Sequence, residues 1–498
     1  MRRPPRAPRG CASSRRTTCT AHSSRVRTRR ACRAAASARS PPRSRARARE
    51  CTGDCVSILL DGGDEFQGTP ASNLAYGRPI VEAFRRLDLA ASALGNHEFD
   101  WTVDTLRARI RQAPYAILGA NVRFTDGRAV PWLRADTIVR RGGLRVGVVG
   151  LATTETPTTT RAANVRGLRF DSLAPVIDAH ARALRARGAD VVIVVAHSGA
   201  FCDRPAPGES TPTCRGEIVD VARALHEKVD AIVSGHTHSL VNTVVNGIPI
   251  VQARSSGRAL GVVDLSLEGG APTIDVREVV ADSAGPVPPA IDSVVRRAVA
   301  AVASRVNRRI ADVADDMPRE SDEQYALGNL LADAQRWAGR GDVAIMNNGG
   351  IRADLRHGVA TYGSLFEIQP FGNTLYKITV RGRDLRGYFE KLVSGGPRVR
   401  MHTSGVLVTF DPSRPAGSRL VSLTTADGRP LDDDRLYTMV LNDFLVTGGD
   451  GVDLARRATA VTPLNIVDLD ALVGYLGTLP QPVRAPSEER FRVAGASQ

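Results

Sequence analysis

Residues 56–70 read VSILLDGGDEFQGTP, an apolar run that breaks into a cluster of glycines and acids. Such a run predicts a short buried strand that stops at a tight turn. Similar runs recur further along the chain, separated by stretches with helical periodicity. We expect further strands at 90–94, 115–119, 144–150, 190–196, 230–234, 248–252 and 259–267, and helices near 77–87, 103–112, 171–187 and 216–227. This alternation predicts an α/β domain with strands buried on both faces.

The net charge of +15 belongs to one end of the chain. The 498 residues carry 67 Lys+Arg and 52 Asp+Glu, and residues 1–50 hold 16 of the arginines with a single acid. The rest of the chain is neutral overall, which argues against a nucleic-acid-binding domain with a basic face. No apolar run is long enough for a signal-peptide core or a membrane span.

Three interpretations of this basic tail stay open: a disordered arm, a transit peptide, and non-native residues from a misread coding region. Prolines at 4, 5, 8, 41 and 42 disfavour the amphipathic helix of a transit peptide. The chain has three lysines, which indicates an Arg-rich, GC-rich codon usage. We favour the misread region.

The cysteines suggest an oxidising compartment. Cys202 and Cys214 bracket a loop rich in Pro, Gly, Ser and Thr that a disulfide would close, and Cys51 and Cys55 bracket a shorter one. Free thiols are the alternative. The spacing lacks the Cys/His pattern of structural zinc.

Polar side chains follow the predicted strands in order. Because strand ends of α/β folds converge, we expect these side chains to meet. Taken singly, a turn residue, a helix cap or a structural histidine explains each one; five in order favour a metal site. Their oxygen and nitrogen atoms suit Mn, Zn or Fe. The candidate ligands are Asp64, Asn96, His197, His236 and His238.

Seven sequence blocks resemble one known family. GGDEFQGTP (62–70), GNHEFD (95–100), VVAHSG (194–199) and GHTHS (235–239) resemble motifs of calcineurin-like metallophosphoesterases of the 5′-nucleotidase branch. NNGGIRADL (347–355), QPFGNTL (369–375) and NDFLVTGGDG (442–451) resemble the C-terminal substrate domain of that branch. The resemblance covers about residues 56–480.

The fold that this resemblance implies is an αββα sandwich joined by a linker helix to a second α/β domain. We expect four segments: the basic tail (1–55), the metallophosphoesterase domain (56–280), the linker helix (281–312) and the substrate-binding domain (313–498).

The same resemblance implies roles for individual residues. Asp64 would bridge two divalent ions, Zn, Mn or similar; Asn96, His197 and His236 would complete one site, and His238 would belong to the other. His97 would stabilise charge on the phosphoryl group, and Asp100 would orient His97. The implied substrate contacts are Arg352, Arg356, Asn373, Phe444 and Asp450.

The chain departs from the family pattern in two places. No strand ending in Asp-x-His precedes Val56, so one metal site is incomplete and we expect the first sheet to lack a strand. Residues 395–405 (GGPRVRMHTSG) hold no second stacking aromatic, and Arg400 lies near its expected position.

We therefore expect a metal-dependent phosphohydrolase that releases phosphate from nucleotides, with nucleotide sugars and cyclic nucleotides as related substrates. The alternatives are a degenerate, catalytically impaired nucleotide-binding protein and a thiosulfohydrolase-like esterase. The expected partner is a nucleotide or related phosphoester rather than a nucleic-acid polymer or a membrane, and the expected location of the intact protein is periplasmic or extracellular.

Overall fold

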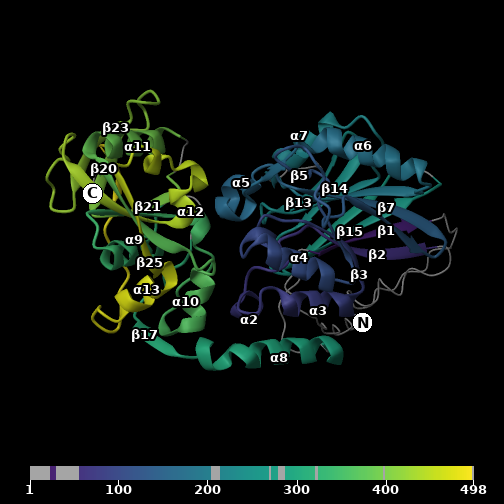
Figure 1. Ribbon diagram of the computed structural model, residues 1–498, viewed down its shortest axis with the longest axis horizontal. Coiled ribbons are helices and arrows are strands. Elements are labelled where there is room, and N and C mark those ends of the chain that lie inside the picture. The colour runs from purple at the N-terminus through teal and green to yellow at the C-terminus, as the bar shows by residue number, and fades with distance from the viewer. Residues whose placement is uncertain are drawn as a thin grey trace, which may run out of the picture.

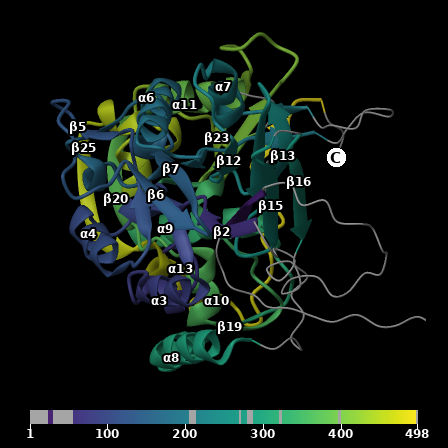
Figure 2. The ribbon, with the colours of Figure 1, turned by 90° about the vertical axis from the view of Figure 1, so that its right-hand side faces the viewer.

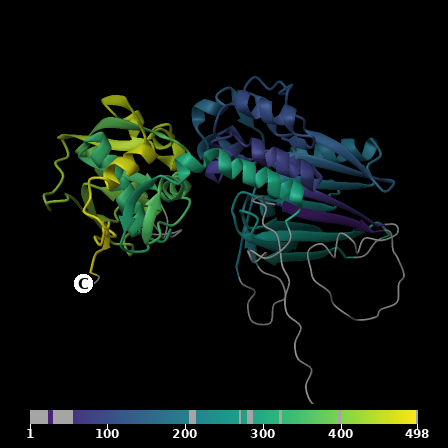
Figure 3. The same ribbon diagram turned by 90° about the horizontal axis from the view of Figure 1, so that it is seen from below.

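The computed structural model describes residues 23–29, 55–203, 213–268, 271–278, 287–319, 324–395 and 399–495. These residues form two α/β domains that lie side by side, and helix α8 (Pro289–Val306) runs beneath one of them and reaches the other at its end (Figure 1). Seen from below, α8 bridges the two domains (Figure 3). The predicted fold class, an αββα sandwich linked to a second α/β domain, is confirmed.

The first domain contains two packed sheets. One sheet has the order β16 (Thr273–Glu278), β15 (Ala259–Ser266), β1 (Ser23–Arg29), β2 (Cys55–Asp61), β3 (Leu89–Ala93) and β4 (Ala116–Leu118). The other has the order β13 (Leu240–Val245), β14 (Ile248–Ala253), β12 (Ala231–Ser234), β9 (Val191–His197), β7 (Leu144–Ala152) and β6 (Asp136–Arg141).

Apolar side chains from the facing sides of the two sheets form the central core. Leu60 of β2 packs there with Val148 of β7 and Ile193 of β9, all fully buried. Each such side chain contributes about 1.5–3 kcal/mol to stability. This core fixes the two sheets to one another, so loops at one edge of both sheets keep a constant spacing.

Helices cover the outer faces of both sheets. α6 (Leu173–Ala186) and α7 (Glu217–Ala224) pack on the second sheet, as Figure 2 shows at its top. α3 (Arg78–Leu87) and α4 (Val103–Gln112) pack on the first. Shorter elements of this domain are α2 (Pro70–Asn73), α5 (Thr156–Thr159), η1 (His97–Phe99), η2 (Ala162–Val165) and the ladders β5 (Val122–Phe124) with β8 (Leu168–Phe170) and β10 (Phe201–Cys202) with β11 (Cys214–Arg215).

Strand β1 corrects one expectation. We expected the first sheet to lack a strand, yet β1, which lies within the basic tail (1–55), runs between β15 and β2. The backbone groups of β15 and β2 need partners, and any extended segment supplies them whatever its side chains. β1 runs antiparallel to β2 and pairs Arg29 with Cys55, so its carboxyl end lies away from Asp61. Cys51 lies outside the described residues.

The second domain is built on a sheet with the order β21 (Met401–Ser404), β18 (Val343–Asn347), β24 (Leu436–Asn442), β20 (Thr374–Arg381) and β25 (Ala460–Val467). The helices α9 (Ala326–Gly339) and α13 (Asp468–Leu476) pack together against it. Helix α11 (Gly382–Ser394) packs against β20 and β23. The remaining elements are β17 (Arg309–Val313), β19 (Gly358–Thr361), β22 (Val406–Phe410), β23 (Leu420–Thr425), β26 (Phe491–Val493), α10 (Tyr362–Ile368), η3 (Asn348–Gly350), α12 (Asp443–Val446), η4 (Gly449–Gly451) and η5 (Leu454–Arg456).

The strands and helices predicted in the first domain are present within one to three residues of the expected ends. In the part of the chain that the structure describes, no helix is both long and apolar enough to cross a membrane.

Candidate metal centre

Five polar side chains stand just beyond the ends of four strands at one edge of the packed sheets. Asp64 follows β2 and Asn96 follows β3 in the first sheet, whereas His197 ends β9 in the second. His236 and His238 follow β12. Four of the five line one cavity of about 220 Å³, and His197 lies fully buried behind it. The structure therefore brings the five candidate ligands to one place.

The ring of His197 is the centre of this group. Its Nδ1 lies 2.8 Å from the carbonyl oxygen of Gly62 and donates to it, which leaves Nε2 to face the other side chains. Three donor atoms from three other loops lie close to Nε2. They are Asp64 Oδ2 at 3.0 Å, Asn96 Oδ1 at 3.1 Å and His236 Nδ1 at 3.2 Å.

These spacings fit the ligand shell of a divalent transition metal. Atoms bound to one ion at about 2.1 Å lie about 3.0–3.4 Å from one another in octahedral or tetrahedral geometry. Two ring nitrogens, a carboxylate oxygen and an amide oxygen are the donors such ions accept. In this structure the donors pair directly with one another, and no three His, Cys, Asp or Glu among the described residues surround a ready-made ion position.

Asp64 and His197 shift each other's pKa in the directions of an ion pair. Burial raises the pKa of Asp64, but the charges of His197 and His97 outweigh it and hold that pKa well below its usual range. Burial lowers the pKa of His197, but the Asp64 carboxylate outweighs it, so the net shift is upward. The pocket thus favours positive charge beside Asp64, where a divalent cation would replace the proton.

The backbone at three of these residues adopts the left-handed region. Asp64 has a φ of 60°, His236 of 77° and His238 of 57°. Each such residue costs of order 1–3 kcal/mol and persists where the surroundings hold it. Gly95 allows the β2 and β3 loops to touch, because a Cβ there would lie 2.1 Å from Asp64 Oδ1.

Glu98, which we did not predict, holds the Asp64 loop in place. Its buried carboxylate accepts the backbone N–H groups of Asp64 at 2.9 Å, Glu65 at 2.8 Å and Gly95 at 2.7 Å. Burial and the charge of Asp64 raise the pKa of Glu98 to about 7. The sequence did carry a signal for this role: Glu98 is an acidic residue inside the GNHEFD block, in a turn too short to form a surface helix.

His97 is held in a fixed orientation at the cavity wall. Its Nδ1 lies 2.8 Å from Asp100 Oδ2, and the other oxygen of Asp100 accepts the hydroxyl of Thr160 at 3.0 Å. Burial lowers the pKa of His97, but the carboxylates of Asp100 and Asp64 outweigh it and raise that pKa to about 9. His97 Nε2 lies 3.9 Å from Asp64 Oδ2 and therefore turns towards the candidate ligands.

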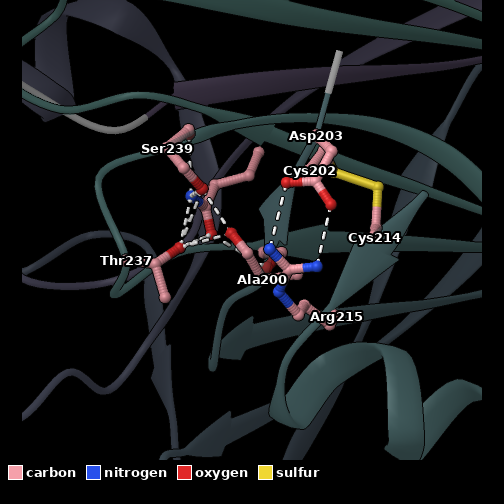
Figure 4. The surroundings of a disulfide bond; sticks show 9 residues. Ala200, Cys202, Asp203, Cys214, Arg215, Thr237 and Ser239 are labelled. Carbon is pink, nitrogen blue, oxygen red and sulfur yellow. Dashed lines mark hydrogen bonds and ion pairs between the residues drawn. A yellow bond between two sulfur atoms is a disulfide. The ribbon is translucent and has the colours of Figure 1, made fainter. Parts of the chain in front are cut away.

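A disulfide-bonded hairpin supports the loop that carries His236 and His238. Of the two alternatives left open for Cys202 and Cys214, the disulfide is present, and it joins β10 to β11. Figure 4 shows the Ala200 carbonyl oxygen just before this hairpin, where Thr237 donates to it at 2.8 Å and Ser239 donates as well. Since Thr237 separates the two histidines, this anchor limits how far both can move.

Side chains of the second domain form the opposite wall of the cavity. Of the predicted substrate contacts, Arg352, Asn373, Phe444 and Asp450 line it. Asp450 accepts a hydrogen bond from Asn347 Nδ2 at 2.6 Å, and burial raises its pKa. Burial also lowers the pKa of Arg352, which lies close enough to Asp64 for their charges to interact.

Arg356 is not brought into the cavity. Its side chain is 67% exposed and pairs with Asp354 at 2.5 Å and Asp316 at 3.8 Å. Its role in substrate binding stays a prediction.

Two residues that our sequence analysis missed lie where the two domains meet. Phe371 stacks on His97 with ring centroids 5.3 Å apart, and the guanidinium of Arg352 lies 5.7 Å from the centre of the same ring. Arg161 also lines the cavity and contacts the second domain. These contacts join distant parts of the chain, so the sequence does not reveal them, although Phe371 itself lies in the QPFGNTL block.

Residues 47–240 match the family model of calcineurin-like phosphoesterases. This match and the αββα sandwich define the class, a metallophosphoesterase domain, and the strand-end loops of that domain carry the candidate ligands. Residues 302–457 match the model of the 5′-nucleotidase C-terminal domain. The chain thus carries the two domains of 5′-nucleotidases in this order, which confirms the resemblance stated above.

Curated relatives and solved structures agree with this assignment. The endonuclease YhcR of Bacillus subtilis is 28% identical over 466 residues, which are 89% of this chain and 37% of that protein. A snake venom 5′-nucleotidase of Naja atra is 27% identical over 84% of this chain and 86% of the enzyme. The cell wall protein Lmo0130 of Listeria monocytogenes is 26% identical over 84% of this chain and 60% of that protein.

Among solved structures, a 5′-nucleotidase precursor from Thermus thermophilus has a TM-score of 0.75 at 28% identity, covering 88% of this chain and 90% of its own. The sulfate thiohydrolase SoxB of Thermus thermophilus has a TM-score of 0.70 at 21% identity, covering 88% and 79%, and shares the fold. The chain thus spans less than two thirds of the Bacillus and Listeria relatives, and nearly all of the Thermus nucleotidase structure.

Proposed function

We propose that this protein is a metal-dependent phosphohydrolase that releases phosphate from nucleotides. The observation that carries the proposal is the convergence of Asp64, Asn96 and His236 on His197 Nε2, at 3.0–3.2 Å. A divalent ion held by these four residues would supply positive charge to a phosphate and lower the pKa of a bound water.

The side chains around this centre have complementary roles. Asp100 accepts the Nδ1 proton of His97 and, together with Asp64, raises the pKa of His97 to about 9, so the protonated ring donates from Nε2 to a phosphate or leaving-group oxygen. Arg352, from the opposite wall, pairs its planar guanidinium with two phosphate oxygens. A phosphate between the two walls would therefore meet positive charge on both sides.

The nucleoside half of the substrate would occupy the second-domain wall. Phe444 offers a ring for base stacking. Because Gly449 has no side chain, the ring of Phe444 can lie directly against the η4 loop. Asp450 and Asn373 supply polar groups for the sugar. Nucleotide sugars and cyclic nucleotides share these features and are related substrates.

One observation favours a second candidate, a catalytically impaired nucleotide-binding protein. The second metal position has Asp64 and His238 in the described chain, and no Asp-x-His precedes Val56 in the sequence. Two protein ligands hold a hydrated divalent ion weakly. We propose one tightly bound ion and a second that binds weakly.

The disulfide supports an extracellular or periplasmic location, because such bonds persist in oxidising compartments. Thiol titration of the protein purified without reductant tests this: we expect Cys202 and Cys214 to react only after reduction and unfolding.

Phosphate release from AMP, with Mn²⁺, Zn²⁺ or Mg²⁺ added separately, tests the function directly. We expect release with Mn²⁺ or Zn²⁺ and at least one tightly bound ion per chain by mass spectrometry. Nucleotide binding without release would favour the impaired protein, and absence of both would contradict the proposal. His226→Ala, an exposed histidine outside the cavity lining, is the matched control.

A further inference from the structure

A short turn of the second domain, residues 370–373, is held by three side chains of the first. Asn73 donates to the carbonyl oxygen of Pro370 at 3.1 Å, and His97 stacks on Phe371. The guanidinium of Arg161 donates to the carbonyl oxygens of Gly372 at 2.5 Å and Phe371 at 3.4 Å. This turn, which we name the docking turn, also carries the cavity residue Asn373.

Arg161 also compensates charge in the second domain. Its Nε lies 3.6 Å from Asp443 Oδ2, at the start of α12. Burial raises the pKa of Asp443, and Arg161 opposes this shift. The compensation exists while the domains are docked, because Arg161 and Asp443 belong to different domains. Arg161 therefore favours the docked arrangement.

Arg161 ends a segment that contacts the candidate metal centre. Residues 153–161 (TTETPTTTR), which we name the threonine-rich loop, follow β7 and include α5. The Thr159 carbonyl oxygen accepts Asn96 Nδ2 at 3.0 Å, which turns Asn96 Oδ1 towards His197. Glu155 Oε2 lies 3.2 Å from His236 Nε2 and orients that ring.

The same loop fixes the orientation of His97. Thr160 donates to one oxygen of Asp100, whose other oxygen holds His97 Nδ1. The base of the loop is anchored separately, since Thr153 donates to Glu217 Oε2 of α7 at 2.9 Å. The loop is thus fixed at its start by α7 and at its end by the docking turn, with the contacts to Asn96, His236 and Asp100 in between.

We propose that Arg161 is a positioning residue that couples docking of the second domain to the alignment of the metal ligands and His97. When Arg161 hydrogen-bonds the docking turn, it fixes the end of the threonine-rich loop. Thr159 and Thr160 then keep Asn96 and Asp100 in the orientations that catalysis requires. The consequence for catalysis rests on the proposed phosphohydrolase function. The consequence for metal affinity does not require turnover.

Three full-length variants test the coupling: Arg161→Ala, Arg161→Lys and the control Arg166→Ala. Arg166 is an exposed arginine five residues further along the same connection. The readouts are the Mn²⁺ dissociation constant by calorimetry, the radius of gyration by small-angle scattering, and kcat and KM for AMP and p-nitrophenyl phosphate.

For Arg161→Ala we expect Mn²⁺ to bind about 3- to 10-fold more weakly, since second-layer contacts of metal ligands are worth up to 10- to 100-fold. We also expect a larger radius of gyration and a kcat about 10-fold lower for both substrates. Arg161→Lys should recover part of each loss, and Arg166→Ala should match the parent protein.

An unchanged Mn²⁺ affinity in Arg161→Ala would overturn the coupling, even if the radius of gyration rises. A rise of KM for AMP with unchanged kcat would overturn it as well, because Arg161 would then serve substrate binding through the second domain. If the parent protein releases no phosphate, the proposed function fails, and the Mn²⁺ affinities still decide the coupling.

Discussion

The two walls of the cavity are built in different ways. On the first-domain wall each of three candidate ligands has a second partner that fixes its direction: Gly62 for His197, Thr159 for Asn96 and Glu155 for His236. On the second-domain wall the guanidinium of Arg352 makes a weak hydrogen bond, to the Gly349 carbonyl oxygen at 3.3 Å.

From this difference we infer that the first wall serves metal binding and catalysis, and that the second wall serves substrate recognition. The first wall is set by strand ends within one packed core, so its geometry is independent of the substrate. The second wall contributes through docking of a separate domain, to which the docking turn belongs. We therefore expect changes of the candidate ligands on the first wall to abolish metal binding, and changes of the substrate contacts on the second wall to alter phosphate or nucleoside binding while metal binding persists.

The largest expected effect is that of His197→Ala. This change removes the central donor and leaves Asp64 buried without its charged partner, so we expect Mn²⁺ affinity and kcat to fall by at least about 100-fold. Calorimetry and phosphate release measure the two losses. His226→Ala should change neither, and a His197→Ala protein that keeps its Mn²⁺ affinity would contradict the site.

Arg352→Lys should come next. A lysine keeps the charge but loses the two-pronged geometry, so kcat/KM for AMP should fall by about 10²-fold. Mn²⁺ affinity should stay within about 2-fold of the parent value, because Arg352 belongs to the opposite wall and its effect on the metal ligands is indirect. A parallel loss of Mn²⁺ affinity would remove the distinction between the two walls.

The third effect is confined to the nucleoside. Phe444→Leu should raise KM for AMP about 3- to 10-fold, which is the value of one stacking contact of about 0.5–1.5 kcal/mol. KM for p-nitrophenyl phosphate should stay within about 2-fold, since its ring does not require the η4 loop. Steady-state kinetics with both substrates on one preparation gives the comparison, and equal changes for both would refute this role.

The sequence could predict the first wall because its signals are local. An apolar run followed at once by Asp64, Asn96 or His197 specifies both a strand and the position of the polar side chain at its end. Glu98 was missed although it lies in the same block as Asn96, because its partners are backbone N–H groups, which do not depend on the type of residue.

The second wall was harder to predict for a physical reason. Phe371 and Arg161 gain their roles from contacts between domains, and their partners in the other domain lie more than 200 positions away. Arg356 has the right chemistry and spacing, yet local pairing with Asp354 directs it to solvent. Strand β1 could not be predicted because its sequence has no apolar pattern. Its backbone pairs with β15 and β2, and backbone hydrogen bonds do not require particular side chains.

The smallest expected effect on activity is that of a buried histidine behind the second wall. His402 is fully buried and hydrogen-bonds Asn348, next to the cavity residue Asn347. Burial, with the charge of Arg490, lowers the pKa of His402 from 6.5 to about 3. As the pH falls, His402 therefore takes up its proton in the unfolded chain before it does so in the folded protein. The free energy of unfolding is thus highest above pH 6.5 and decreases as the pH falls towards 3.

Between about pH 6.5 and pH 4.5 this loss amounts to about 2–3 kcal/mol. Denaturant unfolding of the parent protein and of His402→Gln at both pH values should show a smaller loss in the variant. His226→Gln should keep the full parent loss. An equal pH dependence in all three proteins would show that His402 does not limit acid stability, and activity at about pH 7.5 should change little in any of them.

The most direct test of the metal centre is anomalous X-ray diffraction from crystals grown with Mn²⁺. We predict one strong manganese peak within about 2.3 Å of His197 Nε2, Asp64 Oδ2, Asn96 Oδ1 and His236 Nδ1, with a weaker peak or none beside His238. Two peaks of equal strength would contradict the proposed difference between the two positions. A manganese peak elsewhere, with these four donors still paired to one another, would contradict the account as a whole.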